Sequence, residues 1–556
     1  MEAARRDGRP IWAVLGRPYN LHDPFLNLNL ARHMKKLGVT AVPMDCLPLD
    51  LDGPAGRDDL PVWKHSRQAV VGARWAMGQA GVFPVLLTNF GCGPDAFGLK
   101  HVSRIAADKP HIALEFDEHQ AEAGLITRLE AFLDEVRSAR PSPVLIVKPE
   151  DAVDRDEVHD FRGRKVFIPY FADHAHAFSG AFRAIGVDAE LLPPPDAETT
   201  ALGEEHSSGK ECHAFSFLAG DLIKLARSGR ARDAVYYFPG TAHACLLQQY
   251  GAAMNLILRE QGLTDPRVVS PAFDFTSKAL GLDGMKWLWR GMVAADLLVK
   301  ESCHVRPYEL EPGRTDGVHA RNLADLESGL AGRDLAPALG RCVERLRAIP
   351  VRRESRPLVG VAGDVYTRVN GFANNGLFHK LEAMGCEVWP APFFVDEADF
   401  MVGEALEGAR RELNLSHLAA STVLNLRKNY ERDRVRRLLR FGNVRFVEPG
   451  YEQALLNASP YLGPDNNSLV LLNVAKMVDY SKRGADGVLN IICFNCMLGT
   501  VAAALDERIR KDQKHIPLPT LVFSGMESVS ERARLEAFVH QVKRFAGKRS
   551  GAGLPA

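Results

Sequence analysis

The sequence carries one pattern three times: an apolar strand, a polar loop, a helix that ends at a glycine, and a second strand. The copies begin at Ile11, Lys165 and Leu358, and their helices end at Gly38, Gly186 and Gly385. Two parallel strands need a crossover between them, and this crossover is usually a helix. Each copy is therefore a βαβ unit, whose glycine suits the left-handed residue that closes a helix. The pattern predicts an α/β chain of repeated, doubly wound, Rossmann-like lobes with parallel sheets.

A second repeat lies further along two of the lobes. The pentapeptide RLEAF occurs at Arg128–Phe132 and again at Arg534–Phe538. Each copy stands in an expected helix that follows an apolar strand, Ile112–Phe116 in one lobe and Leu521–Phe523 in the other. The same five residues at the same place indicate that the lobes arose by duplication.

The length of the chain predicts several domains. At about 150 residues per domain, 556 residues are too many for one hydrophobic core. We expect α/β lobes at residues 1–145, 146–350 and 351–546 and a flexible tail at 547–556. The boundaries follow proline-flanked segments at 140–143 and 350–357. We also expect a pseudo-threefold arrangement in which the strand ends of the lobes face one central site.

Composition narrows the function classes. Lysine plus arginine and aspartate plus glutamate both number 69, so no excess charge favours nucleic acid or an anionic membrane as a partner. Met1–Pro10 lacks the apolar core of a signal peptide, and no apolar run reaches the ~20 residues of a membrane span. These features predict a cytoplasmic protein. Because disulfides are rare in the cytosol, its nine scattered cysteines are not expected to form a disulfide framework.

Each lobe contains one strand that ends in a loop with a cysteine. These cysteines are Cys92, Cys245 and Cys496. The carboxyl ends of parallel strands are where α/β proteins place their chemistry, and soft sulfur ligands select iron–sulfur clusters or zinc. Three thiolates would hold a 4Fe-4S cluster with one iron open to substrate. Cys212 is a fourth candidate ligand, because a thiol at the start of an expected helix has a lowered pKa.

The alternative for every cysteine is a small buried hydrophobic residue. This interpretation fits Cys46, Cys342, Cys386 and Cys493, while Cys303, after an expected helix, stays undecided. The CxxC spacing occurs only at Cys493 and Cys496, and one such pair is weak evidence for a metal site. A ligand role for Cys46, Cys303 or Cys493 therefore stays open.

Other motifs carry less information. Arg17, at the end of the first strand, would hold a carboxylate or a phosphate, or else form a salt bridge within its loop. Asn374 and Asn375, near another strand end, are weaker candidates for substrate contacts. The chain has neither a GxxxxGKS/T nor a GxGxxG motif, so it shows no nucleotide-binding signature of its own.

Taken together, the motifs resemble a known family. They are GRPY (Gly16–Tyr19), FGCG-D (Phe90–Asp95), GKEC (Gly209–Cys212), HVRPYE (His304–Glu309), GDVYTRVNGFANN (Gly363–Asn375), ASPYL (Ala458–Leu462) and FNCMLGT (Phe494–Thr500). Their order along nearly the whole chain resembles the C-terminal region of the large acyl-CoA dehydratase activase-related proteins. That region is similar to 2-hydroxyacyl-CoA dehydratase subunits and to double-cubane cluster proteins. The actin-like ATPase part of the large activases has no counterpart in this sequence.

The resemblance implies a 4Fe-4S cluster, or a double-cubane 8Fe-9S cluster, bound by cysteines. It also implies low-potential electrons from a separate actin-like ATPase activase and a small substrate, with acyl-CoA as the associated class. We expect Cys92, Cys212, Cys245 and Cys496 as ligands. The sequence departs from the family pattern around Cys245 and at His213, which follows the GKEC thiol in place of the usual proline. These departures affect the expected substrate and redox potential more than the cluster itself.

The expected function is thus an iron–sulfur reductase or dehydratase component that reduces a small substrate. One alternative is a non-catalytic iron–sulfur scaffold, maturation factor or electron relay. Another is a metal-free binding protein whose cysteines have lost their role. Neither a monomer nor a homodimer is excluded by the sequence.

Overall fold

The computed structural model describes residues 1–51, 63–105, 109–119, 121–139, 163–241, 244–271, 273–525 and 529–549. The expected boundary segment at 140–143 and residues 550–556 of the expected tail lie outside these ranges, so both stay predictions. Within the described ranges, no helix is both long and apolar enough to cross a membrane.

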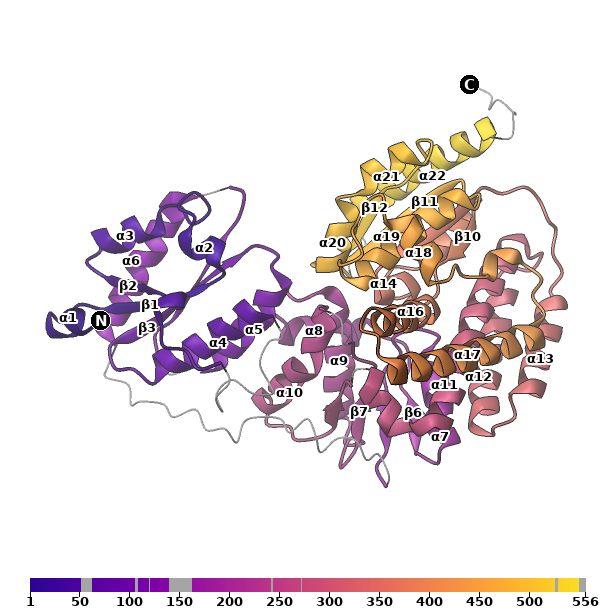
Figure 1. The fold of residues 1–556 in the computed structure, drawn as a ribbon, viewed down its shortest axis with the longest axis horizontal. Coiled ribbons are helices and arrows are strands. Elements are labelled where there is room, and N and C mark those ends of the chain that lie inside the picture. The colour runs from indigo at the N-terminus through magenta and orange to yellow at the C-terminus, as the bar shows by residue number, and fades with distance from the viewer. Residues whose placement is uncertain are drawn as a thin grey trace. The chain divides into compact units, whose positions relative to one another are not determined.

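The described residues form three four-stranded sheets in which all strands are parallel (Figure 1). In spatial order, the first sheet consists of β2 (Thr40–Pro43), β1 (Ile11–Gly16), β3 (Val82–Asn89) and β4 (Ile112–Phe116). The second consists of β6 (Ala189–Leu191), β5 (Val166–Ile168), β7 (Val235–Tyr237) and β8 (Arg267–Val269). The third consists of β10 (Glu387–Pro390), β9 (Leu358–Gly363), β11 (Gly487–Cys493) and β12 (Thr520–Phe523). The strand order is the same in all three sheets, which confirms the predicted α/β class of repeated Rossmann-like lobes.

The first sheet is covered by helices on both faces. Its lobe contains α1 (Glu2–Arg6), α2 (Pro18–His22), α3 (Leu30–Lys36), the 3-10 helix η1 (Met44–Cys46), α4 (Lys64–Met77), α5 (Gly93–Ile105) and α6 (Glu122–Ser138). Alternate side chains of β1 point to opposite faces, as the period of two in a strand requires. Ile11 and Ala13 join one core cluster with residues of α4 and α5, whereas Trp12 and Val14 join another with residues of α3 and α6. Figure 1 shows these two helix pairs on opposite sides of the sheet.

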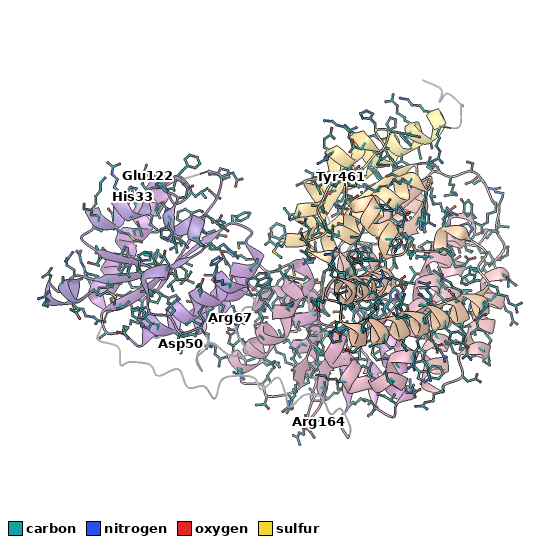
Figure 2. All side chains as sticks on the ribbon, in the orientation of Figure 1. His33, Asp50, Arg67, Glu122, Arg164 and Tyr461 are labelled. Atoms are coloured by element: carbon teal, nitrogen blue, oxygen red, sulfur yellow. The ribbon has the colours of Figure 1, made fainter. Side chains whose placement is uncertain are left out.

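A polar contact ties two of these helices together. Figure 2 shows His33 of α3 beside Glu122 of α6. His33 Nε2 lies 2.9 Å from Glu122 Oε1, and the imidazole is buried while the carboxylate is exposed. Glu122 stands in the first turn of α6, where a negative charge also interacts favourably with the helix dipole.

The second sheet is followed by a body of long helices. Between and after the strands of the second sheet, the chain forms α7 (Ala175–Ala184), α8 (Ala197–His206), α9 (His213–Arg227), η5 (Leu246–Gln249), α10 (Tyr250–Glu260), α11 (Phe273–Val305), η6 (Arg306–Tyr308), α12 (Arg314–Ala331) and α13 (Leu335–Arg347). α7, α11 and α12 approach closely at glycines. A Cβ on Gly180 would lie 2.8 Å from the Glu327 carbonyl oxygen, and one on Gly291 would lie 2.7 Å from Ala177 Cβ.

The third lobe repeats the two-faced sheet of the first. Its helices are α14 (Val365–Val369), α15 (Leu377–Ala383), α16 (Val395–Arg411), α17 (Leu415–Leu439), η7 (Val444–Phe446), α18 (Tyr451–Ala458), α19 (Ser468–Lys482), α20 (Met497–Ala503), α21 (Asp506–Asp512) and α22 (Val529–Arg549). One core cluster joins residues of β9 and β11 to α15 and α22, and another joins the opposite face to α19. The RLEAF pentapeptides lie in α6 and α22, and each helix follows the fourth strand of its sheet.

The chain divides into two compact units. The first comprises the described residues of Met1–Val158, Ser207–Glu211 and Leu246–Gly262, and it contains the first sheet. The second comprises those of His159–His206, Cys212–Cys245 and Leu263–Ala556, and it contains the other two sheets. The pseudo-threefold arrangement of the three lobes stays a prediction.

Candidate functional site

The end of β11 carries the first part of the candidate site. All of β11 is buried, and Cys493 is its last residue. Asn495 adopts a φ of 60°, a left-handed conformation that asparagine tolerates better than most residues, and this conformation turns the chain. Cys496 then caps α20: its sulfur accepts a hydrogen bond from the Gly499 N–H at 3.3 Å. The strand end and the helix start thus hold two thiols within four residues.

The second lobe contributes a third thiol to the same place. Cys212 is buried and is the N-cap residue of α9, as its position before an expected helix predicted. The next residue, His213, donates its backbone N–H to the Phe494 carbonyl oxygen at 3.3 Å. This bond joins the start of α9 to the loop between Cys493 and Cys496.

The three sulfur atoms interact directly, and we call Cys212, Cys493 and Cys496 the thiol cluster. Cys493 shares hydrogen bonds with both other thiols, and no disulfide links them. The hydrogen bond with Cys212 and burial raise the pKa of Cys493 well above its ordinary value. The hydrogen bond with Cys493 and burial do the same for the pKa of Cys496. As free thiols, Cys493 and Cys496 are therefore protonated at neutral pH.

Asp364 fixes the strand end that carries Cys493. Its Oδ2 accepts the Cys493 N–H at 2.9 Å, and its Oδ1 accepts the N–H groups of Tyr366 at 3.0 Å and Thr367 at 2.8 Å. The carboxylate thus caps α14 and anchors β11 simultaneously. Burial raises the pKa of Asp364, while the hydrogen bonds from Thr367 oppose that rise. The charge of Asp364 in turn raises the pKa values of Cys493 and Cys496.

His213 is a buried imidazole next to Cys212 in the chain. Its ring packs edge-on to Phe217, with centroids 4.3 Å apart, and against Gly525, where an added Cβ would lie 2.3 Å from Nε2. Burial lowers the pKa of His213 to about 4, so the ring is neutral at pH 7. Its Nε2 has no hydrogen-bond partner among the described residues.

The donor chemistry of the thiol cluster suits a soft metal, since three sulfur ligands are those that iron–sulfur and zinc sites use. Among the described residues, no three histidine, cysteine, aspartate or glutamate side chains are arranged to enclose a single metal ion. The thiol cluster therefore fits a sulfur-rich centre in its donor atoms and is not a closed site for one ion.

Cys92 lies in the first unit, directly before α5. Arg17 forms a salt bridge with Asp95 at 3.1 Å, and Asp95 also accepts hydrogen bonds from Ser66 and Thr88. Burial and then the Asp95 carboxylate raise the pKa of Cys92 to about 11, and Arg17 opposes the rise. Of the two interpretations of Arg17, the salt bridge within the lobe is the one observed. The ligand role of Cys92 stays a prediction.

The remaining predicted site residues lie in the second unit. Cys245 is half-buried and precedes η5, and its ligand role stays a prediction. Asn374 is buried: its amide donates to the carbonyl oxygens of Thr367 and Arg368, so a substrate contact would require those bonds to break. Asn375 Nδ2 lies 3.3 Å from a carboxylate oxygen of Glu531, on α22.

The other cysteines correct parts of the sequence interpretation. Cys342 and Cys386 are buried, as predicted. Cys46 is exposed, so its assignment to the core was wrong: η1 follows an edge strand that is only half-buried. Cys303 lies inside α11 rather than after a helix, and it is buried. Cys493 is buried as predicted, but its thiol faces two other thiols rather than apolar side chains alone.

One further constellation has the connectivity of a catalytic triad. Ser302 Oγ lies 2.9 Å from His319 Nδ1, and His319 Nε2 lies 2.8 Å from Asp173 Oδ2. The residue Ser302 has 0% relative exposure, so no substrate can reach its hydroxyl. This chain of hydrogen bonds joins α11, α12 and the loop before α7, and its role is structural.

Sequence reasoning missed two residues of the thiol cluster's surroundings. The CxxC spacing was a signal for Cys493, outweighed by the apolar strand around it. Asp364 follows a strand and precedes an expected turn. Its hydrogen bond to the distant Cys493 N–H has no signature in the sequence.

A scan of the chain against protein-family models found no match, and a search of curated proteins found none either.

Proposed function

We propose that this chain is an iron–sulfur protein of an ATP-dependent, low-potential reductase or dehydratase system. The observation that carries the proposal is the thiol cluster, in which Cys212, Cys493 and Cys496 share hydrogen bonds at the end of β11 without forming a disulfide. Cys212 and Cys493 are buried and Cys496 is half-buried, and a cysteine that serves only as a small hydrophobic residue needs no such hydrogen bonds to other thiols.

In this proposal the thiol cluster supplies the first three ligands. Cys92 and Cys245 remain candidates for further ligands. When bound, a 4Fe-4S or double-cubane 8Fe-9S cluster would supply one-electron transfer at low potential. Loading requires the thiols to lose their protons, which makes uptake of the metal depend on pH.

The residues around the thiol cluster would set its properties in three ways. The first turn of α20 directs the Gly499 N–H at the Cys496 sulfur, and Cys212 stands at the N-terminus of α9, where the helix dipole favours a thiolate. Asp364 adds a buried negative charge nearby, which disfavours an added electron and so lowers the reduction potential. Burial of Cys212 and Cys493 keeps water away from the centre.

The proposed partners follow from the ordered motifs, GRPY through FNCMLGT, that resemble the dehydratase activase-related proteins. They are a separate actin-like ATPase that delivers the electron and a small substrate of the acyl-CoA class. We propose the reductase or dehydratase role ahead of a scaffold role, because Cys212 and Cys493 are buried and Asp364 anchors the strand end, whereas a cluster carrier must release its cofactor.

The test uses anaerobically purified and reconstituted full-length protein. We expect about four irons and four sulfides per chain for a single cubane, or about eight irons for a double cubane. An electron paramagnetic resonance signal should appear with dithionite or with an actin-like activase and ATP. Iron absent after reconstitution would refute the proposal. Iron that transfers readily to an apo-ferredoxin, without activase-driven reduction, would favour the scaffold alternative.

A further inference from the structure

The first half of α17 exposes leucines rather than burying them. Only Lys428, Glu431, Val435 and Leu439 of this helix are buried, so no residue of 415–427 is. Exposed large apolar side chains extend along this part of the chain: Leu413 (84%), Leu415 (78%), Val423 (64%), Leu424 (49%), Leu426 (65%) and Tyr430 (59%). Figure 1 shows α17 as one long helix. We call residues 413–426 the arm.

Ion pairs attach the second half of α17 to the neighbouring helices. Lys428 pairs with Asp399, which also accepts from Arg432 at 2.9 Å, and Glu431 pairs with Arg290 at 2.6 Å. These buried ion pairs hold α17 to α16 and α11. The arm, by contrast, contains no aspartate, glutamate, lysine or arginine. A half-helix that exposes its leucines departs from the usual distribution, and an exposed apolar patch is the informative kind of exception.

The exposed apolar residues lie mostly on one face. Leu415, Val423, Leu426 and Tyr430 are spaced by eight, three and four residues, which places them within about 80° of one another around the helix. With Leu282 of α11, which is 77% exposed, the patch has on the order of 700 Å² of accessible surface. A stable interface takes about 800 Å² from each partner, so the patch nearly suffices for one.

We propose that the arm is a dimer interface, in which α17 pairs antiparallel with α17 of a second copy of this chain. A two-fold axis between Thr422 and Val423 sets Leu415 opposite Tyr430 and Ala419 opposite Leu426. Large side chains then face small ones at the centre, and each copy uses the same surface, as a two-fold interface requires. An uncharged face offers a foreign partner no charge complementarity, which favours self-association. This proposal is independent of the proposed function.

The first test measures the mass of the full-length protein at micromolar concentration by sedimentation. We expect about twice the 61.2 kDa of one chain. Leu426→Glu should shift the protein to monomer with unchanged circular dichroism. Leu456→Glu, at a residue of α18 that is 64% exposed, is the matched control and should leave the dimer intact. A monomeric wild-type protein, or a dimer that survives Leu426→Glu, would overturn the proposal.

Disulfide cross-linking tests the antiparallel register without relying on a destabilised dimer. Thr422→Cys stands next to the axis, so oxidation should join two copies efficiently, above the background of the wild-type cysteines. In Leu415→Cys the two introduced thiols would be about 22 Å apart along the helices and should not join. Cross-linking of Leu415→Cys, or none of Thr422→Cys, would overturn the antiparallel pairing.

Discussion

The substitution Asp364→Asn tests how the thiol cluster is held. The carboxylate accepts three backbone N–H groups, from Cys493, Tyr366 and Thr367, at 2.8 to 3.0 Å. Asparagine keeps one accepting oxygen and presents an NH₂ group where the other stood, so at least one N–H loses its acceptor. A hydrogen bond to a charged group contributes about 1.5–3 kcal/mol, and relief of the buried charge offsets part of that loss. We expect the local opening free energy of the Cys493 loop to fall by about 1.5–2.5 kcal/mol.

Amide hydrogen exchange measured by mass spectrometry on the metal-free protein reports this directly. A loss of 1.5–2.5 kcal/mol corresponds to roughly 10- to 70-fold faster exchange in a peptide covering residues 490–497. Asn467→Ala is the matched control, because Asn467 caps α19 through one N–H, that of Leu469. The control should speed exchange at the start of α19 alone. Unchanged exchange at 490–497 in Asp364→Asn would show that the carboxylate does not anchor the strand end.

Three further substitutions test other parts of the structure. Gly525→Ala should lower stability by roughly 2–4 kcal/mol in thermal melting, because φ is +89° and the new Cβ would lie 2.3 Å from the His213 ring; an unshifted melting temperature would contradict that packing. Glu448→Gln should cost about 3 kcal/mol in denaturant unfolding, since it leaves two buried lysines without their carboxylate, and a neutral effect would refute the ion-pair assignment. Burial raises the pKa of Glu397 from 4.5 to about 8, so the folded protein binds the extra proton across that range and stability falls as pH rises. In Glu397→Gln the unfolding free energy should fall less steeply with pH, by up to about 1.4 kcal/mol per pH unit. Identical plots of unfolding free energy against pH for the two proteins would contradict the raised pKa of Glu397.

The strands could be predicted because their signal is local. The expected strands Ile11–Gly16 and Leu358–Gly363 coincide with β1 and β9. β8, at Arg267–Val269, has three residues, which are too few to show a strand pattern although Asp265-Pro266 and Ser270-Pro271 flank them. The helix expected before Cys303 belongs to α11, whose full length was not predicted, and α17 was not predicted. Where these two helices meet, a buried ion pair joins Arg290 of α11 to Glu431 of α17. Hydrophobic periodicity does not reveal a contact of this kind.

The candidate site was predicted only in part, for a related reason. The positions of Cys212 before a helix and Cys496 after a strand follow from local pattern, and both predictions agree with the structure. That Cys493 faces Cys212 depends on the hydrogen bond between His213 and Phe494, residues 281 positions apart in the sequence. Such a contact arises from tertiary packing. An apolar sequence pattern predicts that a cysteine is buried, but it does not predict which residues its sulfur atom faces.

The most direct test of the central claim compares two buried cysteines. Cys493→Ala removes a member of the thiol cluster, whereas Cys386→Ala removes a buried thiol from an apolar core cluster. Both variants are reconstituted anaerobically beside the wild-type protein, and iron and acid-labile sulfide are measured per chain. Our account predicts that Cys386→Ala retains the wild-type iron content and that Cys493→Ala loses most of it. Equal iron in all three proteins would contradict the assignment of the thiol cluster as the cofactor site.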